Sequence, residues 1–170
     1  MTFVANERIT HPLGSSAPGK KRLKALVADD DSTIKALITE VARMEHYETE
    51  TASDGQEAYY NIMWALARCE PFDLVVSDMV MPLMSGDELL QRIKNLYDNL
   101  PTLLGNLYTK NDPQRLPFFL GMSGYDQNAT EYDTRVAAYS KNSLAFLQKP
   151  FSIPAFRKIL SNGVPAYLSS

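Results

Sequence analysis

The chain has 170 residues, of which 45% are hydrophobic and 22% charged, the proportions of one soluble globular domain. A formal net charge of −3 gives no support for a protein that binds nucleic acid or an anionic membrane, and we expect no direct contact with either. The single cysteine, Cys69, excludes an internal disulfide, and the wide separation of His11 and His46 in the sequence argues against a zinc site.

Residues 1–21 show little periodic pattern and are predicted to form a flexible tail without the apolar core of a signal peptide. No apolar run approaches the roughly 18 residues of a membrane-spanning helix. We therefore expect a cytoplasmic protein. Residues 23–28 form a short apolar run, the first predicted strand, which leads directly into Asp29-Asp30-Asp31. Asp31 or Ser32 is expected to cap the following helix. The apolar positions of that helix keep helical spacing: Ile34, Leu37, Ile38, Val41 and Met44.

The second predicted strand, residues 47–52, carries Glu48 and Glu50 on one side, which suits a sheet edge. Asp54-Gly55 then turns the chain into a second helix that ends near Pro71. Residues 74–76 form an apolar, β-branched run typical of a strand buried on both faces. Because Pro82 and Gly86 mark a loop soon afterwards, we expect Asp78 at the carboxyl end of this third strand.

A third helix is predicted from the spacing of its apolar residues, which are Leu89, Leu90, Ile93, Leu96 and Tyr97. Residues 98–115 are rich in Pro, Gly and Asn and are predicted to be an inserted loop, compatible with a short helix at 103–108. Residues 117–122 form a fourth strand that ends in Ser123-Gly124, and residues 127–139 a helix. Residues 144–148 form a fifth strand, which ends in Lys149-Pro150. Ser152 is expected to cap a last short helix, followed by a C-terminal tail at 164–170.

Five alternations of strand and helix predict an α/β fold with a doubly wound parallel sheet and helices on both faces. Right-handed crossovers bring the carboxyl ends of the strands to one edge. Five side chains are expected there: Asp29, Asp30, Asp78, Ser123 and Lys149.

These side chains form a coherent chemical group. Clustered carboxylates repel each other unless a cation intervenes, and oxygen ligands suit Mg²⁺. An aspartate can attack phosphorus, while a metal, a lysine and a hydroxyl stabilise the transferring group. Each residue also has a purely structural interpretation. Asp30 could cap the first helix, Ser123-Gly124 could be an ordinary turn, and Lys149 could be a surface lysine.

Four segments, with Asp54-Gly55-Gln56-Glu57-Ala58 between the first two, carry a specific resemblance. They are Val27-Ala28-Asp29-Asp30-Asp31-Ser32, Val76-Ser77-Asp78-Met79-Val80-Met81-Pro82, Met122-Ser123-Gly124 and Phe146-Leu147-Gln148-Lys149-Pro150-Phe151. Over roughly residues 22–163, this pattern resembles the receiver domains of two-component response regulators. The resemblance implies a flavodoxin-like sheet of five parallel strands in the order 2-1-3-4-5.

The resemblance also implies roles for single residues. Asp78 would be the phosphoacceptor, and Asp29, Asp30, Asp78 and the Val80 carbonyl would hold Mg²⁺. Ser123 and Lys149 would contact the phosphoryl group. Ser123 and Phe146 would form the switch that reports the active state.

The implied activity is signalling by phosphorelay. A sensor histidine kinase or a histidine phosphotransfer protein would phosphorylate this phosphoprotein. The phosphorylated chain would then bind an unknown downstream protein through its fourth helix, fifth strand and fifth helix. The chain would not be an enzyme beyond catalysing its own phosphorylation and dephosphorylation.

From residue 134 onward the sequence contains basic residues and no acid, so we expect a basic signalling face with an acidic partner. Val80 and Tyr125, two residues after Asp78 and Ser123, supply no carboxylate or amide that would position a water molecule, and Tyr125 is bulky enough to shade the phosphorus. We therefore expect slow autodephosphorylation. The chain ends just after the last helix, as expected of a single-domain regulator or of a receiver cut from a longer protein.

Two alternatives remain at this point. Asp29-Asp30-Asp31-Ser32-Thr33 also fits the nucleophile motif of haloacid-dehalogenase-type phosphatases, although no acid follows Asp133 to supply their later metal ligands. The other alternative is a pseudo-receiver, a binding module whose pocket is not phosphorylated.

Overall fold

The computed structural model describes residues 22–104, 115–124 and 144–168. The predicted N-terminal tail, the predicted helix at 127–139 and Tyr125 lie outside these ranges. The described elements follow one another along the chain in this order: β1 (Lys24–Ala28), α1 (Ser32–Met44), β2 (Glu48–Ala52), α2 (Gly55–Ala67), β3 (Leu74–Asp78), α3 (Gly86–Leu104), β4 (Phe118–Ser123), β5 (Leu144–Gln148), α5 (Ile153–Lys158), a π-helical turn η3 (Ile159–Gly163) and α6 (Val164–Leu168).

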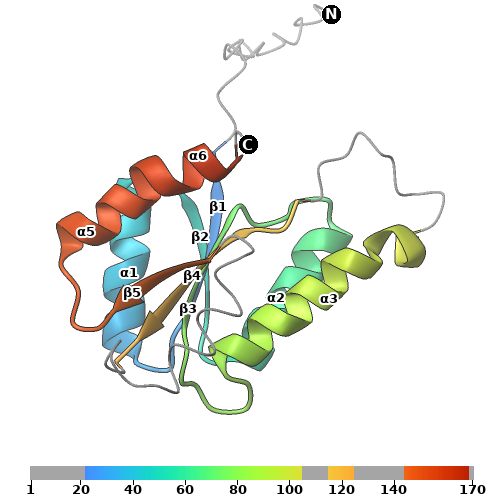
Figure 1. Cartoon of the computed structure of the whole chain (residues 1–170), viewed down its shortest axis with the longest axis horizontal. Coiled ribbons are helices and arrows are strands. Elements are labelled where there is room, and N and C mark those ends of the chain that lie inside the picture. The colour runs from blue at the N-terminus through green and yellow to red at the C-terminus, as the bar shows by residue number, and fades with distance from the viewer. Residues whose placement is uncertain (1–21, 105–114, 125–143, 169–170) are drawn as a thin grey trace, which may run out of the picture.

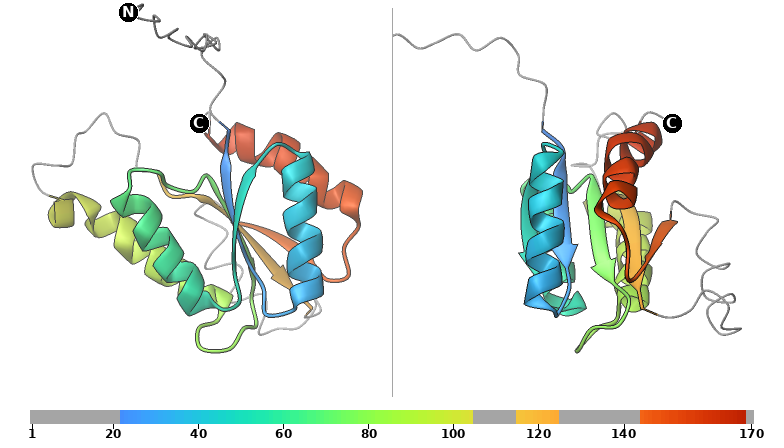
Figure 2. Two further views of the ribbon diagram at one scale, coloured as in Figure 1. Left: turned by 180° about the vertical axis from the view of Figure 1, so that it is seen from behind. Right: turned by 90° about the vertical axis from the view of Figure 1, so that its left-hand side faces the viewer.

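The five strands form one parallel sheet in the order β2-β1-β3-β4-β5, which confirms the predicted fold and strand order. Helices α1 and α5 cover one face of the sheet, and α2 and α3 cover the other (Figures 1 and 2). Strand β2 lies at an edge, as its charged residues predicted. Its Glu48 is exposed to solvent there.

Alternating side chains of the central strands build two cores. On β3, Val75 points into the core beneath α2 and α3, whereas Leu74 and Val76 point into the core beneath α1 and α5. All three side chains are fully buried. This double burial explains why the third strand is continuously apolar, and it holds the carboxyl end of β3 in a rigid frame.

Two predicted boundaries are wrong. Helix α3 continues to Leu104, so residues 98–104 do not belong to a loop, and residues 105–114 lie outside the description. The apolar spacing of α3 extends one turn further to Leu100, which is only 4% exposed and packs in the α2–α3 core. That contact favours continuing the helix through the segment whose Pro and Asn content suggested a loop.

The C-terminal segment is the second correction. Residues 164–168 are helical and Val164 is fully buried, so this part of the chain is not a tail. The phenol of Tyr47 donates a hydrogen bond of 3.0 Å to the Leu160 carbonyl of η3, which ties this segment to the start of β2. Burial raises the pKa of Tyr47 to about 12, so the phenol remains a donor at physiological pH.

Helix α1 buries a narrower stripe than its spacing predicted. Ile38 and Val41 are buried against the sheet, but Leu37 and Met44 are 48% and 59% exposed. Helix α2 buries a continuous apolar stripe formed by Ala58, Ile62, Ala65 and Leu66.

Candidate functional site

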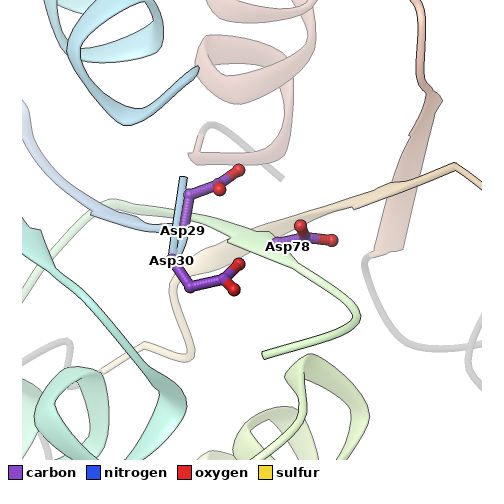
Figure 3. A group of neighbouring side chains, drawn as sticks. All are labelled: Asp29, Asp30 and Asp78. Atoms are coloured by element: carbon purple, nitrogen blue, oxygen red, sulfur yellow. The ribbon is translucent and has the colours of Figure 1, made fainter. Parts of the chain in front are cut away.

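Three aspartates meet at the carboxyl edge of the sheet (Figure 3). Asp29 and Asp30 follow β1, and Asp78 ends β3. One carboxylate oxygen from each of the three lies within 4.8 Å of the others. Asp29 is fully buried, Asp78 is partly buried and Asp30 is exposed, so the cluster opens to solvent on one side. The topology therefore brings together the three carboxylates that the sequence predicted.

Lys149 joins two of these carboxylates. Its Nζ donates to Oδ2 of Asp29 at 2.9 Å and to Oδ2 of Asp78 at 2.7 Å. Its backbone N–H donates to the Ser123 carbonyl at 2.7 Å, and a cis peptide bond links it to Pro150. The β4–β5 edge thus holds this lysine at the site, which argues against a role as an ordinary surface lysine.

The helix that follows β1 fixes the orientation of Asp29. The Asp31 side chain caps α1 by accepting hydrogen bonds from the N–H groups of Thr33 and Ile34. The Asp31 backbone N–H donates to Oδ1 of Asp29 at 2.9 Å. Because Asp31 is the cap, Asp30 has no capping role, and the structural interpretation of Asp30 is wrong.

The pKa values of Asp29 and Lys149 report the balance between burial and pairing. Burial raises the pKa of Asp29 above its ordinary value, and the hydrogen bonds from Lys149 and Asp31 reverse this only in part. Burial alone would lower the pKa of Lys149, but its hydrogen bonds to Asp78 and Asp29 outweigh that effect and raise it. Lys149 therefore stays charged, and the proton most readily gained by this pair is on Asp29.

A close approach of two backbone segments holds the loop after Asp78. A Cβ at Gly86 would lie 2.3 Å from the Asp78 carbonyl oxygen, so only glycine fits there. The Gly86 N–H donates to the Met79 carbonyl at 3.2 Å, and the Val80 N–H donates to Oδ1 of Asp78 at 3.2 Å. Sequence reasoning treated Gly86 only as a loop marker, although it supports the backbone of Asp78. The Val80 side chain is 56% exposed.

Ser123 and Phe146 lie on the two strands beyond Asp78. Ser123 ends β4 and is 2% exposed. Phe146 on β5 is paired in register with Gly121 of β4. A Cβ at Gly121 would lie 2.7 Å from Cε1 of Phe146 and 2.9 Å from Sδ of Met79. Because Gly121 has no side chain, the Phe146 ring can pack there, beside Met79. The sequence analysis did not predict this role of Gly121.

The donor set fits a hard divalent cation. Three carboxylates and one ammonium leave an excess of negative charge at the site. In proteins Mg²⁺ usually binds to oxygen ligands at sites that keep an open side. Among residues 22–104, 115–124 and 144–168, this is the one group of three or more His, Cys, Asp or Glu side chains that could hold a metal ion.

Comparison with known proteins identifies the family. The family model of the response regulator receiver domain matches residues 25–125. The response regulator GtcR of Aneurinibacillus migulanus is 28% identical over 124 residues, which cover 71% of this chain and 49% of GtcR. The sporulation initiation phosphotransferase F of Bacillus subtilis is 34% identical over 89 residues, 52% of this chain and 68% of that protein. The chain thus spans about half of GtcR and a larger share of the phosphotransferase.

Solved structures share this fold. A response regulator receiver domain protein from Clostridium thermocellum superposes with a TM-score of 0.61 at 22% identity, over 86% of this chain and 98% of that one. The receiver domain of a Francisella response regulator gives 0.60 at 25% identity, over 85% and 98%.

Two further findings concern membrane-spanning helices and the phosphatase alternative. Among the described residues, no helix combines the length and the apolar character needed to cross a bilayer. In the phosphatase motif the first aspartate, Asp29, would be the nucleophile, but Asp29 is fully buried. The sheet order, the site geometry and the family match lead to one conclusion: the chain belongs to the response regulator receiver domains of two-component signalling.

Proposed function

We propose that Asp78 accepts a phosphoryl group from a sensor histidine kinase or a histidine phosphotransfer protein. The observation that carries this proposal is the position of Asp78, whose partly buried carboxylate contacts Lys149 and lies within 4.8 Å of a carboxylate oxygen of each of the two other aspartates. A carboxylate oxygen of Asp78 would form the new O–P bond while the donor's P–N bond breaks and its electron pair stays on the donor nitrogen. Asp29 is too buried for this role, and Asp30 lacks the lysine contact that the structure gives to Asp78.

The same residues support a requirement for Mg²⁺. Asp29, Asp30 and Asp78 would hold the ion with the Val80 backbone carbonyl. When bound, the ion supplies positive charge that offsets the phosphoryl oxygens. Lys149 would turn one of its donors from the carboxylates to a phosphoryl oxygen, and the Ser123 hydroxyl would bind another. Because the Asp29 pKa is raised, metal binding has to displace a proton more often as the pH falls.

Labelling by acetyl phosphate tests the site. We expect Mg²⁺-dependent labelling of the full chain, its loss in Asp78→Asn, and loss of both metal binding and labelling in Asp30→Ala. Asp31→Asn is the matched control, because Asn caps a helix as well as Asp does and should retain labelling. Undiminished labelling of Asp78→Asn, or of Asp30→Ala with the metal chelated, contradicts the assignment. A folded chain that binds Mg²⁺ but is never labelled would be a pseudo-receiver.

The switch would pass from the phosphoryl group through Ser123 to Phe146. The Phe146 ring is half-buried and packs where Gly121 lacks a side chain. A shift of Ser123 toward a phosphoryl oxygen would change the space available to that ring. Phosphorylation should therefore alter the environment of Phe146, which aromatic NMR signals would report. Unchanged Phe146 signals in the phosphorylated chain would contradict this route.

The downstream partner would bind at the fourth helix, β5 and α5. Among the described residues, one of the basic side chains expected on this face is exposed and without a carboxylate partner in the structure, namely Lys158 on α5. Lys149 is occupied in the pocket and Arg157 Nε pairs with Glu45 Oε1 at 2.6 Å, whereas Arg135 and Lys141 lie outside the described residues. If the face is basic, binding to an acidic partner weakens as salt is added, and binding indifferent to ionic strength contradicts the proposal.

The aspartyl phosphate would be lost slowly. The Val80 side chain projects into solvent next to Asp78 and has no polar atom to orient a water molecule. Tyr125, outside the described residues, would shade the same approach. Val80→Asn and Tyr125→Glu should each speed dephosphorylation, which a phosphate-release assay measures. Rates equal to that of the unsubstituted chain would show that these positions do not control hydrolysis.

A further inference from the structure

The outer face of α2 carries large apolar side chains that the receiver function does not explain. Tyr60, Met63 and Trp64 are 51%, 42% and 65% exposed, and we call these three residues the α2 patch. Their spacing of three and four residues places them on one side of the helix, opposite the buried Ala58 and Ile62. Seen from behind, α2 lies in front of α3 on the outside of the molecule (Figure 2, left). The patch therefore faces away from both cores.

An exposed tryptophan beside a tyrosine is the composition of a binding hot spot, because these side chains bury much apolar area at little entropic cost. Tyrosine and tryptophan each carry about 150–250 Å². About half of the Tyr60 area and two-thirds of the Trp64 area are exposed. With Met63 added, the exposed surface of the α2 patch is on the order of 300 Å². Two such patches in contact would bury less than the roughly 1,200 Å² of a stable complex, so the association would be weak.

Charges at the two ends of α2 indicate which partner fits. Glu57 lies three residues before Tyr60, and Arg68 lies four residues after Trp64, so the patch is centred between an acid and a base. Both are exposed and both lie on the β2 side of α2. Glu57 Oε2 accepts from the Ser53 N–H at 2.7 Å, and Arg68 Nη2 lies 3.7 Å from Glu50 Oε1.

This charge pattern is complementary to itself when the helix is reversed. A two-fold axis through the middle of the α2 patch would place Glu57 of each copy beside Arg68 of the other, on the same flank of the pair. The central residues Tyr60, Met63 and Trp64 would then pack against their own equivalents. A parallel two-fold arrangement would instead place each residue level with its own equivalent and on the opposite flank, so neither Glu57 nor Arg68 would meet an opposite charge. Glu57 contacts Ser53, just after β2, and Arg68 contacts Glu50 of β2, each through one side-chain atom. A carboxylate has a second oxygen and an arginine has five N–H donors, so these contacts leave capacity for a further one.

We propose that two copies of this chain associate weakly through antiparallel packing of their α2 helices, centred on Trp64. The surface is distinct from the phosphorylation site, so Asp78→Asn should associate as well as the unsubstituted chain. Since Trp64 is the single tryptophan of the chain, its fluorescence reports this surface directly.

The first experiment compares sedimentation equilibrium with tryptophan emission over a concentration series of the full chain. We expect a monomer–dimer equilibrium, and emission that moves to shorter wavelength in step with the dimer fraction as water leaves Trp64. Met63→Lys should weaken association at least about tenfold, whereas the matched variant Met44→Lys, on the opposite face of the sheet, should not. Circular dichroism and thermal unfolding of each variant show whether the fold is kept.

The second experiment exchanges charges between copies. Glu57→Lys alone and Arg68→Glu alone each oppose like charges across the two-fold axis and should dimerise less. An equimolar mixture of the two variants restores both ion pairs and should regain association. This rescue does not depend on how much the loss of the Glu57 contact with Ser53 destabilises α2, because it compares the same two chains apart and mixed.

Three results would overturn the proposal. One is a chain that stays monomeric throughout the concentration series. Another is a dimer whose Trp64 emission does not change, or which Met63→Lys leaves intact, because its interface lies elsewhere. The third is a mixture of the two charge variants that associates no better than either variant alone.

Discussion

Replacing Lys149 by methionine removes the one cation that the described site places between Asp29 and Asp78. The substitution removes the hydrogen bonds from Lys149 Nζ to Asp29 and Asp78, of 2.9 and 2.7 Å. Only 17% of the Lys149 side chain is exposed. Hydrogen bonds to charged groups contribute about 1.5–3 kcal/mol each, and breaking a buried ion pair costs about 3–5 kcal/mol. Protonation of Asp29, whose pKa is already raised, relieves part of this loss. We expect a decrease of about 2–4 kcal/mol in the free energy of unfolding.

Urea unfolding followed by circular dichroism, at neutral pH with divalent metals chelated, measures this loss. With a slope of about 1–3 kcal/mol per molar urea, the midpoint should fall by roughly 1–2 M. Lys158→Met, at an exposed lysine on α5, is the control and should shift the midpoint little. Added Mg²⁺ should recover part of the loss in Lys149→Met, because the ion brings positive charge to the same carboxylates.

A double-mutant cycle separates the ion pairs from simple loss of packing. In the Asp29→Asn background the buried carboxylate is neutral, so Lys149→Met should cost less there than in the unsubstituted chain. Equal costs in the two backgrounds, or a loss below about 1 kcal/mol in Lys149→Met, would refute the view that Lys149 neutralises this pair.

Three further predictions follow from other contacts. Because the native pKa of Asp29 is raised, the folded chain holds a proton that the unfolded chain releases near pH 3.8; without metal, stability should fall as the pH rises from there through the native pKa. In urea titrations, Asp29→Asn should not show this fall and should be more stable than the unsubstituted chain at neutral pH. A pH profile of stability parallel to that of the unsubstituted chain would contradict this prediction. Tyr47→Phe deletes the donor to the Leu160 carbonyl and should cost about 1–2 kcal/mol, seen as a lower thermal midpoint; an unchanged midpoint would show that this tie does not hold the C-terminal helix. Gly121→Ala places a Cβ 2.7 Å from the Phe146 ring, so it should cost about 1–3 kcal/mol and shift the aromatic NMR signals of Phe146, and signals left in place would argue against this contact.

Local sequence patterns predicted the strands and most of the pocket. The apolar run around Val75 is short, β-branched and buried on both faces. Such a run is typical of a central strand of a parallel sheet. Once the strands alternate with helices, right-handed crossovers bring their carboxyl ends to one edge. Asp29, Asp78 and Lys149 could therefore be placed together before any coordinates, because topology and chain order suffice for that inference.

Element ends depended on contacts made across the fold. Pro101 and its neighbours locally favour a loop, yet Leu100 is buried between α2 and α3 and the helix runs on to Leu104. Val164 follows a glycine, yet its burial extends the last helical segment beyond the predicted tail. A proline inside a helix costs about 3 kcal/mol and a glycine about 1 kcal/mol. Burying a side chain such as Leu100 or Val164 contributes about 1.5–3 kcal/mol, which is of the same size, so contacts across the fold offset these local preferences at both boundaries.

The finer assignment of roles within the site also came only from the structure. Three consecutive aspartates follow β1, and their order in the sequence does not say which one is buried, which caps the helix and which faces solvent. The geometry assigns these positions to Asp29, Asp31 and Asp30 in turn. Likewise, nothing local marks Gly121 as the space beside Phe146, because the two residues become neighbours only when β4 and β5 pair. The sequence by itself determined which chemical groups reach the sheet edge, whereas the tertiary structure decided how each is buried and paired, because burial and pairing depend on residues distant in the chain.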